Sequence, residues 1–112
     1  MERIEEYRKH IEKLFLEREN LGSMRPGVET EAILDRERDR YQLVRVGWQD
    51  NNTRVYGCLL HVDIKDGKIW IQEDGGEEAI ADQLVAMGVP AKDIVLGYHA
   101  PHVRQYTEFA VS

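Results

Sequence analysis

The spacing of apolar residues over the first 21 positions predicts an amphipathic helix. Apolar side chains recur every three or four residues, at Ile4, Tyr7, Ile11, Leu14 and Phe15. Charged side chains occupy most of the positions between them. Gly22 follows and can adopt the left-handed conformation that ends a helix. We therefore expect a helix over residues 1–21 with one face in a core.

Four segments after this helix have the alternating, β-branched and aromatic pattern of strands. In chain order they are VETEAIL, YQLVRVGW, TRVYGCLLHVDI and KIWIQE. Short polar turns separate them, which predicts an antiparallel meander. Asp66-Gly67 between the last two fits a two-residue type I′ turn, because that turn needs positive φ at both central residues.

The Asp66-Gly67 turn predicts the register of the last two strands, with Ile64 opposite Ile69. The core face should then comprise Tyr56, Cys58, Leu60, Val62, Ile64, Ile69 and Ile71. The other face should carry Val55, Leu59, His61, Asp63, Trp70 and Gln72, with Asp63 opposite Trp70 and His61 opposite Gln72.

The turn around DNNT is less determined by its sequence. A loop of three or five residues, or a bulge, keeps the aliphatic residues of both flanking strands on the core face. This choice pairs Trp48 with Tyr56, Val46 with Cys58 and Val44 with Leu60.

The C-terminal third returns to helical spacing in EEAIADQLVAMG, between Gly75-Gly76 and Gly88. Such a short helix needs a packing partner, so we expect it on one face of the sheet. DIVLGY predicts a short strand, Pro101 a helical turn, and TEFAV an extended closing segment. We therefore predict an α+β fold in one domain over residues 1–112: N-terminal amphipathic helix, meander of about four strands, second helix on the sheet, short C-terminal strand and closing segment.

Charge and composition narrow the functional classes. The 21 acidic and 15 basic residues give a net charge of −6, which opposes the neutralisation of phosphates that drives nucleic-acid binding. The single cysteine cannot form an internal disulfide, no apolar h-region follows the opening MERIEEYRKH, and no run reaches about 18 apolar residues. We expect a cytoplasmic protein that does not bind membranes and for which direct DNA binding is unfavourable.

A metal site built on histidines is the weaker interpretation of the C-terminal stretch GYHAPHVRQYTEFA. Two residues separate His99 from His102, fewer than the usual three to five of zinc fingers. His61 could complete a three-histidine site only if the tail folds across the sheet. We therefore favour a structural closure of the fold that also carries an interaction surface.

Two other arrangements suggest enzyme chemistry but have stronger structural explanations. Asp63, Lys65 and Glu73 resemble a divalent-ion nuclease site, yet Glu73 is predicted on the face of Ile71, away from Asp63. Gly75-Gly76 precedes a helix N-terminus that could bind phosphate, but Glu77 and Glu78 in its first turn would repel an anion. Cys58, predicted in the core, lacks an assignable base. We expect no enzymatic activity, no catalytic residue, no metal and no cofactor.

The stretches ERDRYQLVRVGW, RVYGCLLHVDIKDGKIWIQ, VPAKDIVLGYH and RQYTEFAV resemble the XisI-like family, the fdxN-element excision controlling factors. The resemblance runs from about Tyr7 to the C-terminus. It implies a compact α+β domain and a supporting role in DNA recombination, in which a separate site-specific recombinase excises an element together with a companion controlling factor, XisH. It brings no catalytic motif that can be placed on this chain.

Combined with the acidic charge, this resemblance favours an accessory factor that acts through protein contacts. The expected partners are the XisH-like companion and the recombinase, and self-association stays open. The residues expected at a partner contact are Trp70, His61, His99, His102, Arg104 and Tyr106. The alternative is direct DNA contact through a local arginine patch at neighbouring strand ends, formed by Arg36, Arg38, Arg40, Arg45 and Arg54. A metal-dependent enzyme is the more distant alternative.

Overall fold

The computed structural model describes residues 2–23, 25–76 and 78–112. Its elements are α1 (Glu2–Leu21), β1 (Val28–Asp35), β2 (Arg40–Gln49), β3 (Thr53–Lys65), β4 (Lys68–Asp74), α2 (Ile80–Ala86), the 3₁₀ helix η1 (Ala91–Asp93), β5 (Ile94–Leu96) and α3 (Pro101–Arg104). This order confirms the predicted α+β fold. The predictions for Met1 and Glu77 lie outside the described residues.

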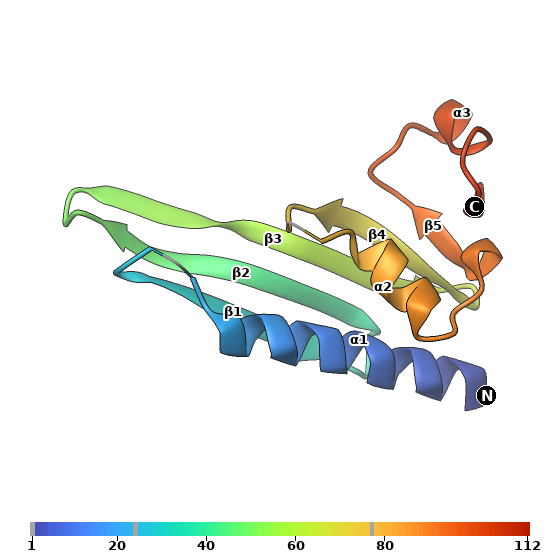
Figure 1. The fold of residues 1–112 in the computed structure, drawn as a ribbon, viewed down its shortest axis with the longest axis horizontal. Helices are drawn as coiled ribbons and strands as arrows, with labels where there is room; N and C mark the ends of the chain where they lie inside the picture. The colour runs from blue at the N-terminus through green and yellow to red at the C-terminus, as the bar shows by residue number, and fades with distance from the viewer. Residues whose placement is uncertain (1, 24, 77) are drawn as a thin grey trace.

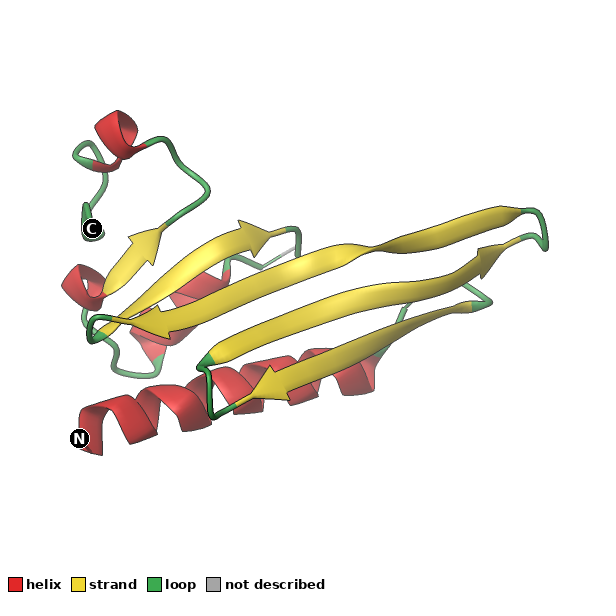
Figure 2. Ribbon diagram, turned by 180° about the vertical axis from the view of Figure 1, so that it is seen from behind, coloured by secondary structure: helices red, strands yellow, loops and turns green. Residues whose placement is uncertain are grey.

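The five strands form one sheet in chain order, with β1 to β4 antiparallel and β5 parallel to β4. Figure 1 shows α1 running along β1 and β2, with α2 beside it over β3 and β4. Figure 2, seen from behind, shows that neither α1 nor α2 crosses the opposite face, which we call the open face. The hairpin of β2 and β3 reaches past the end of α1 (Figure 1). None of the helices in the described ranges has both the length and the apolar character needed to cross a membrane.

The core lies between the two helices and the sheet. The predicted stripe of α1 is buried there at Tyr7, Ile11, Leu14 and Phe15, and Ile4 packs against it. These residues meet the buried side chains of α2 and of the sheet, among them Ile80, Leu84, Leu43, Leu60, Val62, Ile69 and Ile71. Gly22, with φ of 70°, ends α1 as predicted, and its N–H donates to the carbonyls of Arg18 and Glu19.

The hairpin of β3 and β4 turns at Asp66 and Gly67, whose φ values are 54° and 76°. Both values are positive, as the predicted type I′ turn requires. Ile64 lies opposite Ile69, Val62 opposite Ile71 and Asp63 opposite Trp70. The sequence therefore predicted this end of the sheet correctly.

A bulge in β3 makes the predicted facing of the β2–β3 hairpin wrong. Leu43 lies opposite Leu60 but Val44 lies opposite Cys58, so Leu59 is an extra residue that reverses the alternation. The following aliphatic and aromatic residues therefore lie on the open face and outside the core cluster: Val44, Val46, Trp48, Tyr56 and Cys58. Leu59 and Val55 fall on the helix side, the reverse of the prediction.

The pairing of this hairpin also differs by two residues from the predicted one. Trp48 lies opposite Arg54, Val46 opposite Tyr56 and Val44 opposite Cys58. Residues 50–52 form the connecting loop, because Gln49 pairs with Thr53. The expected odd loop length is confirmed, although the strands start pairing closer to the turn than predicted.

A second register shift, between β3 and β4, corrects the placement of Glu73. His61 lies opposite Glu73 and not opposite Gln72, which is the extra residue. Glu73 therefore shares the open face with His61. Partial desolvation of the Cys58 thiol, followed by the nearby Glu73 charge, raises the pKa of that thiol. Cys58 itself is exposed, so its predicted position in the core is wrong.

The second helix is shorter than its pattern predicted, because it begins only at Ile80. The Asp74 carboxylate accepts a hydrogen bond from the Ile80 N–H at 3.2 Å and so caps the start of α2. Glu78 precedes the helix, which corrects its predicted place in the first turn. β5 and the turn of helix at Pro101 are confirmed, and Ala110 forms an isolated bridge to Val95.

Candidate protein interaction surface

The half of the open face around Trp70 gathers several of the predicted contact residues. Trp70 projects from β4 and is partly buried beneath two cations. The Lys65 ammonium lies 4.2 Å and the Arg104 guanidinium 5.4 Å from the centre of its ring. Its indole Nε1 is buried without a hydrogen-bond partner among the residues that the structure describes. Aromatic rings stacked with cations are typical of protein interfaces.

His61 lies next to this tryptophan in a small polar network. Its Nε2 lies 3.0 Å from an Asp63 carboxylate oxygen, and the Gln72 side-chain amide donates to the other oxygen at 3.3 Å. These contacts fix three side chains on the open face beside Trp70. We call Trp70 and His61, together with the tail residues His99, His102, Arg104 and Tyr106, the tryptophan patch; Arg104 joins the tail to Trp70.

Arg104 explains why the tail adopts its shape. Its guanidinium donates to the carbonyl of His99 at 3.1 Å and to those of Val111 and Gly97 at 3.3 Å each. The Ala110 N–H donates to the Ile94 carbonyl at 2.8 Å, which ties the end of the tail to β5. The stretch GYHAPHVRQYTEFA is therefore held as a closure of the fold, as predicted.

Other side chains of the tail are accessible on its surface. The Tyr106 side chain is 81% exposed. His102 on α3 is exposed, and the His99 ring lies 4.6 Å from the ring of Tyr98. Within residues 2–23, 25–76 and 78–112 the structure contains no group of three histidine, cysteine or carboxylate residues that could hold a metal ion. His61, His99 and His102 therefore do not converge.

The other half of the open face carries exposed aromatic residues that the sequence pattern had assigned to the core. Trp48 is 51% and Tyr56 71% exposed. The Arg54 guanidinium lies 5.4 Å from the ring centre of Trp48 and 5.9 Å from that of Tyr56. The one local signal for this arrangement was the Leu59-Leu60 doublet, which breaks strict alternation.

The five arginines of the predicted DNA-contact patch are distributed over two ends and two faces of the sheet. Arg36 donates to both oxygens of Glu12, at 2.8 and 3.1 Å, and Arg38 pairs with Asp35 at 3.2 Å. Arg40 is exposed at the start of β2. Arg45 lines a cavity on the helix side, whereas Arg54 lies on the open face. The structure does not gather them, and DNA contact by any one of them stays a prediction.

Two concave regions lie on the helix side. The larger, about 590 Å³, is lined by apolar and charged residues that include Leu14, Leu43, Leu59, Arg18 and Arg45. Arg18 already donates to the Glu78 carbonyl at 3.0 Å and to the Gln83 side-chain carbonyl, and burial lowers its pKa.

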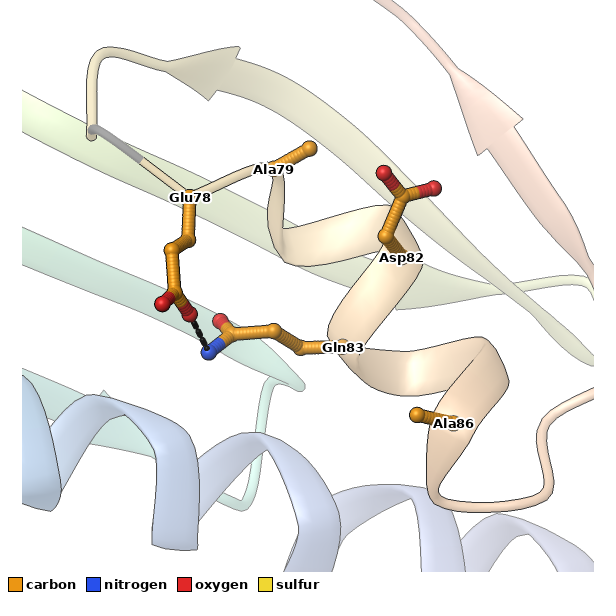
Figure 3. Close-up of a pocket in the computed structure, with 5 residues that line it drawn as sticks. All are labelled: Glu78, Ala79, Asp82, Gln83 and Ala86. Carbon is orange, nitrogen blue, oxygen red and sulfur yellow. Dashed lines mark hydrogen bonds between the residues drawn. The ribbon is translucent and has the colours of Figure 1, made fainter.

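The smaller concave region, about 370 Å³, lies against α2. Figure 3 shows Glu78 and Gln83 pointing toward each other, while Asp82 projects away from them. The Gln83 amide donates to the Glu78 carboxylate at 2.6 Å. Two carboxylates and two alanines line this region, which is unfavourable for a phosphate.

Comparison with protein-family models identifies the family to which this chain belongs. The family model described as XisI protein matches residues 1–111. The chain belongs to the XisI family. This confirms the resemblance noted in the sequence.

Two solved structures support this assignment. A XisI-like protein from Anabaena variabilis ATCC 29413 is 45% identical with a TM-score of 0.89, over 96% of this chain and 97% of that one. The fdxN element excision controlling factor XisI from the same organism is 37% identical with a TM-score of 0.85, over 98% of this chain and 99% of that one. The chain matches none of the curated proteins with which it was compared.

Proposed function

We propose that this protein is an accessory factor that controls the site-specific excision of a DNA element, acting through protein contacts. Membership of the XisI family supports the process, because one structural relative is named as an fdxN element excision controlling factor. The net charge of −6 supports the mode of action, since it disfavours unassisted binding to DNA. The proposed partner is a companion controlling factor of the XisH type, with the recombinase as a further partner of the assembly.

The observation that carries this proposal is the tryptophan patch on the open face. Tryptophan, tyrosine and arginine are the residue types that most often dominate binding energy at interfaces. Here Trp70 and Arg104 stack, and Tyr106 projects into solvent from the same tail. The Arg104 side chain is held by hydrogen bonds to backbone carbonyls and Trp70 is partly buried beneath it, so these two side chains lose little ordering entropy on binding.

The test is calorimetric titration of the XisH-like companion with wild-type protein and with Tyr106→Ala and Trp70→Phe variants. We expect each variant to bind at least about tenfold more weakly, which corresponds to about 1.4 kcal/mol. Val85→Ala is the matched control, because Val85 is 41% exposed on α2, on the other side of the sheet. Wild-type affinity in both test variants would reject the tryptophan patch as the contact, and absence of any complex would reject the proposed partner.

A further inference from the structure

The outer half of the open face has a pattern of charge that is complementary to itself. Across the sheet, Glu29 on β1 lies beside Val46 on β2, which lies beside Tyr56 on β3. In the neighbouring rows, Glu31 aligns with Val44 and Cys58, and Trp48 aligns with Arg54. We call these eight residues the arm patch. Its centre is apolar along β2, one flank carries two carboxylates, and the other flank carries one guanidinium.

We propose that the arm patch is the interface of a two-fold homodimer in which the open faces of two copies stack. In a symmetric dimer of this kind, the same surface of each copy must complement itself. A two-fold axis along β2, between the stacked faces, places β1 of one copy over β3 of the other. Val46 and Trp48 then meet their own counterparts near the axis, whereas Val44 is already buried within each copy.

This arrangement gives Glu29 and Arg54 partners of opposite charge, whereas Glu31 comes to lie over Cys58. Glu29 of each copy comes to lie over Tyr56 of the other, one row from Arg54. Within one copy β2 separates Glu29 from Arg54, so that about 10 Å lies between their strands. Among the described residues neither side chain forms an ion pair. The dimer therefore supplies two Glu29–Arg54 pairs that one copy cannot form.

The aromatic residues of the arm patch also favour a second copy of this chain as the binding partner. Arg54 is already held over the rings of Trp48 and Tyr56, which orients its guanidinium before association. Both rings are more than half exposed, at 51% and 71%, on a face that neither α1 nor α2 crosses. Stacking two copies removes this apolar surface from water. Because the patch spans only three strands, we expect a small interface and an equilibrium that depends on concentration.

This inference goes beyond the proposed function and does not depend on it, because the tryptophan patch occupies the other half of the open face. The test is sedimentation equilibrium of the wild type, Glu29→Arg, Arg54→Glu and the double variant that combines them. We expect the wild type to dimerise, each single variant to dimerise at least about tenfold more weakly, and the double variant to recover most of the lost affinity. Both side chains are exposed, so circular dichroism and the unfolding midpoint should stay unchanged.

A monomeric wild type at all concentrations would overturn the proposal. Single variants that dimerise like the wild type would also overturn it, because they would place the interface elsewhere. Single variants that weaken the dimer without recovery in the double variant would overturn the proposed axis. Tyr106→Ala should leave dimerisation unchanged, which separates this test from that of the companion.

Cross-linking provides a second readout that does not depend on charge. Val46→Cys in a Cys58→Ser background places the one thiol near the proposed axis. We expect oxidised glutathione to link two copies of this variant at least about tenfold faster than two copies of Asp82→Cys in the same background. Asp82 is exposed on α2 and lies on the helix side, away from the open face. Equal cross-linking rates would contradict the stacked arrangement.

Discussion

Replacing Arg104 by alanine should detach the C-terminal tail while leaving the rest of the sheet intact. The guanidinium bonds three carbonyls that lie between Gly97 and Val111 and stacks on Trp70 at 5.4 Å. The other ties of the segment that follows β5 include the backbone hydrogen bonds from Gly97 to Ile71 and from Ala110 to Ile94, and the packing of Phe109 against the core. Arg104 therefore joins the tail to itself and to the open face.

These contacts determine how much stability the tail should lose in Arg104→Ala. The bonds to His99 and Gly97 are partly buried and should contribute about 0.5–1.5 kcal/mol each, whereas water can replace the exposed bond to Val111. The stacking on Trp70 adds about 0.5–1 kcal/mol. We expect Arg104→Ala to destabilise the tail by about 2 kcal/mol.

The assay uses tryptophan emission. The chain has two tryptophans, so Trp48→Phe leaves Trp70 as the single reporter. In this background Arg104→Ala should shift the Trp70 emission to longer wavelength before urea unfolds the core. Arg104→Lys keeps the charge but cannot bond three carbonyls together, so it should behave like alanine. Unchanged emission and stability in Arg104→Ala would refute the view that this residue closes the tail.

Two further predictions concern polar contacts of α1 with other elements: the buried contact of Tyr7 with Asp93 and the partly buried contact of Arg8 with Asp39. The Tyr7 hydroxyl donates to the buried Asp93 carboxylate at 2.5 Å, so Tyr7→Phe should lower the free energy of unfolding by about 1–3 kcal/mol in urea titrations. Burial and Asp93 raise the pKa of Tyr7 to about 12, so the wild type should lose this contribution as pH rises from about 10 through 12, and the variant should not. Asp39 accepts from Arg8 at 2.7 and 3.0 Å, which holds the pKa of Asp39 below its ordinary 3.8. Its contribution is present above pH ~5 and is lost as pH falls through the lowered folded-state pKa. Asp39→Asn, which tolerates the φ of 55° at this position, should cost about 1–2 kcal/mol at neutral pH and should flatten the acid limb of the stability profile. An acid limb as steep as that of the wild type would contradict the role of this carboxylate.

Local chemistry predicted most of the elements because each one depends on neighbouring residues. The stripe of α1, the stop at Gly22 and the Asp66-Gly67 turn are signals within a few positions of one another. The turn then fixed the pairing of Val62 and Ile64 with β4. The pattern was correct wherever alternation continued without interruption.

The sequence could not predict which side chains of the outer β2–β3 hairpin lie on the open face, because a single extra residue decides this. The bulge at Leu59 sends Tyr56 and Cys58 to the face opposite Leu60, although all three share the same sequence parity. A bulge is selected by packing between the sheet and α1 as a whole, and alternation within one strand carries no information about that packing. For the same reason the sequence pattern placed Trp48 and Tyr56 in the core, although both are exposed.

The candidate contact residues of the tail were predicted from composition, whereas their arrangement comes from tertiary structure. Arg104 reaches Trp70 across the parallel pairing of β4 and β5, and that pairing brings residues 70 and 104 together. The five arginines of the proposed patch are not gathered because they lie at two ends and on two faces of the sheet. Arg36 and Arg38 also have nearby acidic partners, Glu12 and Asp35. In an acidic chain, such pairing removes charge from the surface offered to DNA.

We propose that this protein acts through protein contacts, and fluorescence anisotropy with a labelled DNA duplex distinguishes this mode of action from direct DNA binding. The protein is titrated at low and moderate salt, first alone and then with its companion, on a duplex that carries an element border or an arbitrary sequence. We expect no change in anisotropy with the protein alone, even at low salt. Saturable binding by the protein alone that weakens steeply with salt would contradict this proposal, because the slope would count phosphates neutralised by its own arginines.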